Sequence, residues 1–142
     1  SEKFKLPLSI SYTPTDTEFL TSFDSNEDIY GVVTKGDEIP YFAKNQLNAT
    51  LGLQHKKFEV NLNSRYTGAF RTKAGSGPIP ENSKVDSNFI VDLSAHYFFD
   101  ENFMFSTNII NLFDSEYAVS RVPAGLRPGH PFGISFAVGY GF

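Results

Sequence analysis

Large apolar residues alternate with small or polar residues along most of the chain. In the segment that ends the chain, 132–142, bulky apolar side chains occupy every second position, with Gly, Ser and Ala between them. The same period of two occurs in six segments: 4–13, 46–54, 58–67, 88–99, 103–112 and 132–142. Because successive side chains of a strand point to opposite faces, this period predicts six antiparallel β-strands, each with an apolar face. No segment shows a capped 3.6-residue stripe, so no long helix is predicted.

The predicted strands are long, and the segments between them alternate in length. The strands run to about ten residues, whereas strands of soluble proteins average about five or six. Two connections are short (55–57 and 100–102), and three are long and polar (16–44, 70–87 and 114–131). Strands of this length cross a bilayer at a steep tilt, and short turns opposite long loops are typical of outer-membrane barrels. Aromatic residues near the strand ends fit the interfacial girdles of such barrels.

A soluble antiparallel sheet with its apolar face inside would show the same alternation. The second face of the last segment argues against it, because Gly133, Ser135, Ala137, Gly139 and Gly141 carry none of the charges that keep water-exposed strands from aggregating. A lumen packed against an internal plug favours such small residues. The strand lengths and the loop asymmetry therefore favour the membrane.

Composition excludes several classes of protein. The 142 residues fit one domain, and the absence of Cys excludes disulfide scaffolds and Cys-ligated metal sites. A net charge of −4 argues against nucleic-acid binding. No run of about 18 apolar residues occurs, so a spanning helix is excluded. Mean hydropathy is −0.24, which is compatible with a transmembrane barrel, since its strands are polar at every second residue. A start at Ser1 suggests a piece of a longer chain.

Several motifs carry a family resemblance. Near the C-terminus they are Asn111-Leu112-Phe113-Asp114, Tyr117, Ser120-Arg121, the stretch 123–131 (PAGLRPGHP) and an alternating strand that ends on Phe142. This pattern resembles the C-terminus of TonB-dependent outer-membrane receptors. With the upstream motifs 6–8 (LPL), 12–13 (YT), 36–41 (GDEIPY) and 91–94 (VDLS), it is most similar to the ferric dicitrate receptor branch. One position departs from the family pattern: Phe132 stands where the family usually has Arg.

The resemblance implies an all-β fold in which residues 1–142 form the last six strands of a 22-stranded transmembrane β-barrel. The N-terminal plug and the earlier strands would lie outside this sequence. It implies TonB-energised uptake of a ferric-siderophore-type complex, with ferric citrate as the favoured cargo, in the outer membrane of a Gram-negative bacterium. The implied partners are outer-membrane lipid, the receptor's own plug, TonB, and the assembly machinery that reads the C-terminal strand. Six strands alone would leave two open edges, which are costly in lipid and predict aggregation or edge pairing.

Two alternatives remain open at this stage. Another cargo, such as a different siderophore, cobalamin or an oligosaccharide, would fit the same superfamily. A self-contained β-barrel that binds a ligand or serves a structural role would fit the alternation but would have to close without further strands.

Candidate ligand-binding residues follow from the charge of a ferric citrate complex. Arg presents paired donors to carboxylates, so the loop residues Arg71, Lys73, Arg121 and Arg127 are candidates. Arg121 and Arg127 have a structural alternative, in which they bind carbonyls of their own turn-rich loop or the plug. Arg71 and Lys73 border the Gly75–Pro78 stretch, which we expect to be mobile.

No catalytic or metal site is expected, and no cofactor. The acidic residues of the first long loop lack the spacing of a calcium loop, and the three His residues lack metal spacing. No nucleophile elbow occurs, so the sequence does not predict an enzyme.

Three further residues are assigned structural roles. The alternation fails at the end of segment 103–112, which predicts a bulge or bend where Asn111 and Asp114 hydrogen-bond the backbone. The terminal aromatic Phe142 is assigned to the lipid face, as the resemblance implies.

Overall fold

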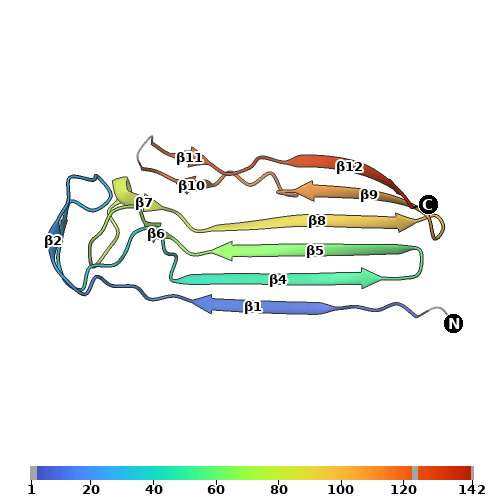
Figure 1. Cartoon of the computed structure of the whole chain (residues 1–142), viewed down its shortest axis with the longest axis horizontal. Coiled ribbons are helices and arrows are strands. Elements are labelled where there is room, and N and C mark those ends of the chain that lie inside the picture. The colour runs from blue at the N-terminus through green and yellow to red at the C-terminus, as the bar shows by residue number, and fades with distance from the viewer. Residues whose placement is uncertain (1–2, 123–124, 142) are drawn as a thin grey trace.

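A computed structural model describes residues 3–122 and 125–141 of the chain, and these residues form an all-β structure (Figure 1). The main element is a six-stranded antiparallel sheet in the order β1-β4-β5-β8-β9-β12. Its strands are β1 (Leu8–Pro14), β4 (Asn45–Gln54), β5 (Phe58–Thr67), β8 (Asn88–Phe98), β9 (Phe103–Ile110) and β12 (Gly133–Tyr140). All six predicted strands are therefore present. Each long strand pairs with the long strand that follows it in the sequence, so the sheet is a meander.

Short elements lie in the connections. The two-stranded ladders are β2 (Phe23–Asp24) with β3 (Val32–Val33), β6 (Phe70–Arg71) with β7 (Lys84–Val85), and β10 (Ala118–Ser120) with β11 (Arg127–Pro128). A 3-10 turn, η1 (Glu81–Ser83), precedes β7. Among the described residues, no helix has the length and apolar character to cross a membrane.

The first strand is shorter than predicted because of Pro7. The alternation predicts a strand from Phe4, but β1 begins at Leu8. Proline has no N–H to donate to a ladder. Pairing resumes beyond it, since Lys5 and Gln54 exchange two backbone hydrogen bonds of 3.0 and 2.9 Å.

The register brings the apolar positions of all six strands into common rows. Residues paired across an antiparallel sheet point to the same face. One row crosses the whole sheet and contains Leu8, Leu51, Leu62, Leu93, Ile109 and Ile134. A neighbouring row on the other face contains Gly52, Asn61, Ser94, Asn108 and Ser135. The sheet thus has one apolar face and one face of mainly small or polar residues, on which Ile90, Phe98, Met104 and Ile110 are the large apolar exceptions.

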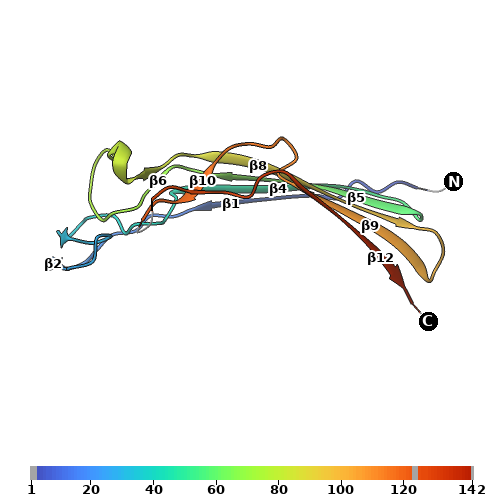
Figure 2. The same cartoon turned by 90° about the horizontal axis from the view of Figure 1, so that it is seen from above.

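The sheet is a single twisted layer, and no second layer of the described chain covers its apolar face (Figure 2). Leu8 and Ile10 on β1 are each 64% exposed, as is Phe136 on β12. The only cluster of buried apolar residues in the described chain lies among the loops, where Ala43, Phe70 and Val85 pack together. The sandwich expected of a soluble sheet is not formed by these residues.

The sheet is also open. β1 and β12 are its two edge strands and do not pair with each other. Both tight turns and both ends of the described chain lie at one end of the sheet, and the three long connections lie at the other (Figure 1). The predicted asymmetry of short turns and long loops is therefore confirmed, and these residues do not close into a self-contained barrel.

Gly52 offers a test of the packing between β1 and β4. Its N–H donates to the carbonyl of Pro7 at 2.8 Å, and a Cβ there would lie 2.6 Å from Pro7 Cγ. We expect Gly52→Ala to displace the segment before β1, at a cost of about 1–3 kcal/mol. Gly139→Ala is the matched control, because its Cβ would meet only Met104 Cε, at 3.5 Å. Amide hydrogen exchange of Lys5 and Gln54 measures the effect, and equal protection in both variants would contradict it.

Candidate functional site

Three long loops meet at one end of the sheet: the first loop (residues 15–44), the second loop (68–87) and the third loop (111–132). Between the second and third loops lies a pocket of about 730 Å³. Ligand pockets commonly have volumes of about 300–1,000 Å³. The residues that line it are Lys84, Asp86, Ser87, Asp114, Ser115, Glu116, Tyr117, Ala118, Arg121, Leu126, Pro128, Gly129, His130 and Pro131.

Asn111 anchors the third loop to the sheet. It is 1% exposed and has a φ of +50°, a left-handed conformation that Asn tolerates better than most residues. Its N–H donates to Asp92 Oδ1 at 2.8 Å. Its side-chain Nδ2 donates to the carbonyls of Ser115 and His130, at 3.0 and 2.9 Å, and its Oδ1 accepts from the Ser115 N–H at 2.9 Å. One amide side chain therefore joins the two ends of the loop that forms the pocket wall.

Asp114 makes a second tie between the same ends. It has a φ of +49°, and its Oδ1 accepts a hydrogen bond from the N–H of Phe132 at 2.9 Å. The alternation ends at Ile110 because Asn111 and Asp114 turn the backbone out of the strand conformation.

Tyr117 holds the far side of the third loop. Its carbonyl accepts from the Gly129 N–H at 2.7 Å, and its hydroxyl accepts from the His130 N–H at 3.1 Å. The ring packs so closely over Gly129 that any Cβ at that position would collide with it. Glycine is required there by the approach of the ring.

The pocket contains charges of both signs. Lys84 Nζ lies 2.8 Å from Asp86 Oδ1 and 3.4 Å from Glu81 Oε1, and hydrogen bonds to Asp86 and then Glu81 raise the pKa of Lys84. Arg121 is half-buried, and its Nε donates to the Lys84 carbonyl at 3.0 Å, which joins the third loop to the second.

The four basic residues chosen from the sequence occupy different environments. Arg121 lines the pocket. Arg127, on β11, and Lys73, in the second loop, are exposed and are not among the lining residues. The Arg71 side chain is 4% exposed and is committed to Glu38 and the Gly77 carbonyl. Phe142 lies outside the described residues.

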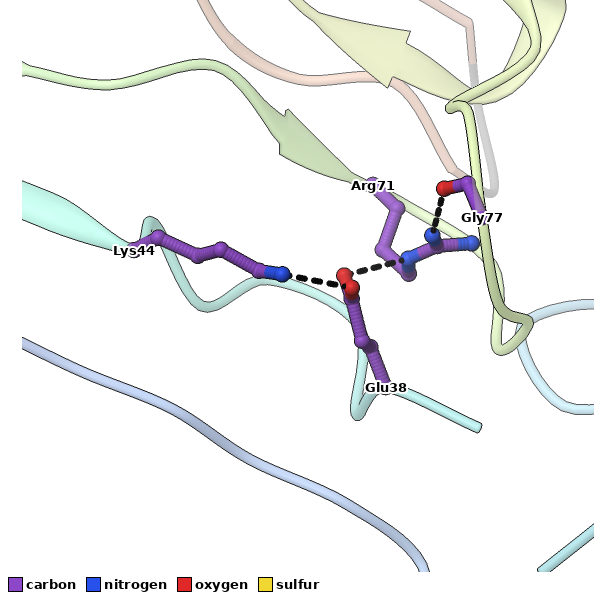
Figure 3. Close-up of polar contacts among 4 residues, drawn as sticks. All are labelled: Glu38, Lys44, Arg71 and Gly77. Atoms are coloured by element: carbon purple, nitrogen blue, oxygen red, sulfur yellow. Dashed lines mark hydrogen bonds and ion pairs between the residues drawn. The ribbon is translucent and has the colours of Figure 1, made fainter. Parts of the chain in front are cut away.

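The Glu38–Arg71 pair ties the first loop to the second (Figure 3). Glu38 Oε2 accepts from Arg71 Nε at 2.9 Å, and Oε1 accepts from Lys44 Nζ at 2.7 Å. Burial raises the pKa of Glu38. The hydrogen bonds and positive charges of Lys44 and Arg71 together lower it by more, so the pKa lies below its usual value. The sequence groups Glu38 with the other acidic residues of the first long loop and does not reveal its pairing with Arg71, which lies 33 positions away.

Metal ligation finds no support in the part of the chain that the structure describes. Residues 3–122 and 125–141 contain no group of three or more His, Cys, Asp or Glu side chains placed to hold an ion. His96 lies in the sheet, where its Nδ1 is 2.9 Å from Ser106 Oγ.

Comparison with known proteins yields structural matches only. No protein-family model and no curated protein matches the sequence. The closed form of the ferric-catecholate import receptor Fiu from E. coli K12 matches 94% of this chain with a TM-score of 0.71 and 20% identity. The open form of Fiu matches 70% with a TM-score of 0.59 and 24% identity.

These matches concern the fold. The chain spans only 18% and 15% of the length of the two receptor chains it matches. The six-stranded antiparallel meander matches part of the fold of these import receptors, which confirms the predicted all-β fold class. Nothing in the matches singles out the dicitrate branch.

The role of Asn111 can be measured locally. Asn111→Ala removes three side-chain hydrogen bonds and places Ala at a positive φ, so we expect the third loop to open more easily by about 3 kcal/mol. Asn111→Gly tolerates the positive φ, so its effect measures the loss of the side-chain hydrogen bonds without the backbone strain. Hydrogen exchange at the Ser115 and Phe132 amides is the measurement, with exposed Asn108→Ala as the control. Unchanged exchange in Asn111→Ala would contradict the assignment.

The lowered pKa of Glu38 makes the contact between the first two loops sensitive to acid. A carboxyl whose pKa falls on folding stabilises the folded state above its ordinary pKa, and this contribution is lost as pH falls through the lowered value. We expect exchange at the Glu38 and Ala74 amides, corrected for intrinsic rate, to be constant above the ordinary value of 4.5 and to speed up as pH falls below it through the lowered pKa. Glu38→Gln should abolish this dependence, while Glu101→Gln, in a tight turn, should retain it. The same pH dependence in Glu38→Gln would refute the prediction.

Proposed function

We propose that residues 1–142 form the C-terminal segment of a TonB-dependent outer-membrane receptor that imports a ferric-siderophore-type complex. The observation that carries the proposal is the open, single-layer sheet. Its long strands leave one apolar face uncovered from β1 to β12, and its three long loops all lie at one end. A structure of this kind is stable in a bilayer only when both edges are paired, so we propose that further strands complete the barrel. The resemblance of the motifs implies 22 strands in total.

The chemistry of the apolar face fits a membrane. Its central row is aliphatic, from Leu8 to Ile134. Aromatic residues lie in a row nearer the loops (Tyr12, Tyr66 and Phe89) and in a row nearer the tight turns (Phe58, Tyr97 and Phe105). Aromatic side chains favour the two membrane interfaces, with aliphatic residues between them.

The pocket between the second and third loops is the proposed point of ligand contact. Arg121 supplies a cationic donor suited to an anionic ferric complex, and the hydroxyls of Ser87 and Ser115 add neutral donors. Lys84 is paired with Asp86 and Glu81, so we assign it no direct role in binding. Ferric citrate is the first cargo that we propose, on the resemblance of the motifs. Ferric catecholates are the second, because the structurally similar receptor Fiu is named for them.

The proposed transport requires no covalent chemistry by these residues. The complex binds at the outer mouth, the loops close, and a plug supplied by the rest of the receptor rearranges when TonB acts from the periplasm. Outer-membrane lipid surrounds the apolar face, and the assembly machinery of a Gram-negative outer membrane reads the C-terminal strand. The similar solved structures are import receptors rather than enzymes, which fits this role.

Binding of ferric dicitrate to the whole receptor in detergent tests the proposal. We expect Arg121→Gln to weaken binding about tenfold, because a charge-assisted hydrogen bond is lost. Arg127→Gln should stay within about twofold, because an exposed charge outside the pocket contributes little. Titration with a ferric tris-catecholate and with cobalamin distinguishes the cargo classes.

Two results would contradict the proposal. One is a wild-type receptor that binds no ferric complex of either class. The other is an intact mass near 15.8 kDa for the polypeptide made by the cell, because six strands with two open edges cannot form the barrel.

A further inference from the structure

Tyr41, in the first loop, has an unusual backbone conformation. Its φ is +68°. Glycine adopts this left-handed region readily, but bulky residues rarely do. A residue is held in such a conformation only when the surrounding contacts over-determine it. The contacts that hold Tyr41 in this conformation therefore indicate its role.

Tyr41 touches both other loops. Its N–H donates to the Arg71 carbonyl of the second loop at 2.8 Å, and its ring lies 6.0 Å from that of Phe70. Its hydroxyl reaches the third loop, where it donates to the Val122 carbonyl at 3.0 Å and accepts from the Val122 N–H at 3.1 Å. A single side chain thus bonds both backbone groups of a residue 81 positions away.

Val122 directly follows Arg121, which lines the pocket. Two residues earlier, Ser120 Oγ lies 3.5 Å from the Tyr41 hydroxyl, and Ser120 pairs with Arg127 in the β10–β11 ladder. Tyr41 itself is not among the lining residues. It therefore contacts the pocket wall from outside the pocket.

The first and second loops have other ties. Besides the Glu38–Arg71 pair, the Glu38 N–H donates to the Gly75 carbonyl, and the Ala74 N–H donates to the Ile29 carbonyl. Within the described residues, the hydrogen bonds between the first loop and the third all involve the Tyr41 hydroxyl. Removal of this one oxygen atom should therefore abolish the direct hydrogen bonds between the third loop and the first. The third loop would then be held through the second loop, by the bond from Arg121 to the Lys84 carbonyl and by the packing of Ala118 on the cluster of Ala43, Phe70 and Val85.

We propose that Tyr41 is a positioning residue that couples the first loop to the pocket wall, so that the three loops move as one cap and Arg121 is held in place. The coupling stands on the contacts alone. Its effect on ligand affinity rests on the function proposed above.

The test uses pairs of spin labels on the whole receptor. The chain has no Cys, so labels introduced here are unique within it. One pair joins the first and third loops, at Lys35→Cys and Val119→Cys, and the other joins the first and second loops, at Lys35→Cys and Lys73→Cys. All three positions are exposed. We expect Tyr41→Phe to broaden the distance distribution of the first pair and leave that of the second pair unchanged.

Tyr30→Phe is the matched control. Tyr30 lies in the same loop and packs by its ring against Phe19 and Phe23, at centroid distances of 6.1 and 6.2 Å. Loss of its hydroxyl should leave both label pairs unchanged.

The distance measurement and the binding measurement have separate outcomes. An unchanged distribution for the first pair in Tyr41→Phe, or equal broadening of both pairs, would overturn the proposed coupling. If the wild type binds a ferric complex, Tyr41→Phe should weaken binding by about tenfold or less, as expected for coupling through a positioning contact. If the wild type binds none, the proposed function fails, and the distances still decide the coupling.

Discussion

The antiparallel register of the six long strands is the constraint on which the rest of the structure depends. It aligns Leu51, Leu62 and Leu93 across three central strands and continues the row to both edges. Every second residue then faces one side, so a single slip of one residue would move a whole strand's apolar side chains to the polar face. Because the sheet is one layer, no part of the described chain covers its apolar face (Figure 2), and this supports the proposal that lipid covers it.

The third loop is held by a different kind of interaction. The buried apolar cluster of Ala43, Phe70 and Val85 belongs to the first and second loops, whereas the third loop is shaped by polar ties from Asn111, Asp114 and Tyr117. The pocket is therefore built from hydrogen-bonded backbone more than from packed side chains. Polar ties of this kind are directional, so they can hold a loop in one shape without a core beneath it, and each one that is lost leaves buried groups unpaired.

The strands could be read from local sequence because their period is a local property. Segment 58–67 coincides with β5, and segment 88–99 differs from β8 by one residue. The deviations have local causes as well, namely Pro7 before β1 and the positive φ of Asn111 after β9. The dicitrate branch lies beyond what the structural matches show, since a fold shared at 20% identity does not by itself fix the cargo.

The sequence by itself determined the six strands, their apolar and polar faces, and the asymmetry of turns and loops. Each of these features depends on a pattern that can be read from a short stretch of sequence, namely the alternation of apolar residues or the position of a polar stretch. Only the tertiary structure decided the roles of the loop residues. Arg71 and Arg121 look alike in the sequence, yet one is buried against Glu38 and the other lines a pocket. Their environments depend on partners 33 and 37 positions away, and Tyr41 reaches a residue 81 positions away. Contacts over such separations form only when the sheet brings the loops together, so no local pattern predicts them.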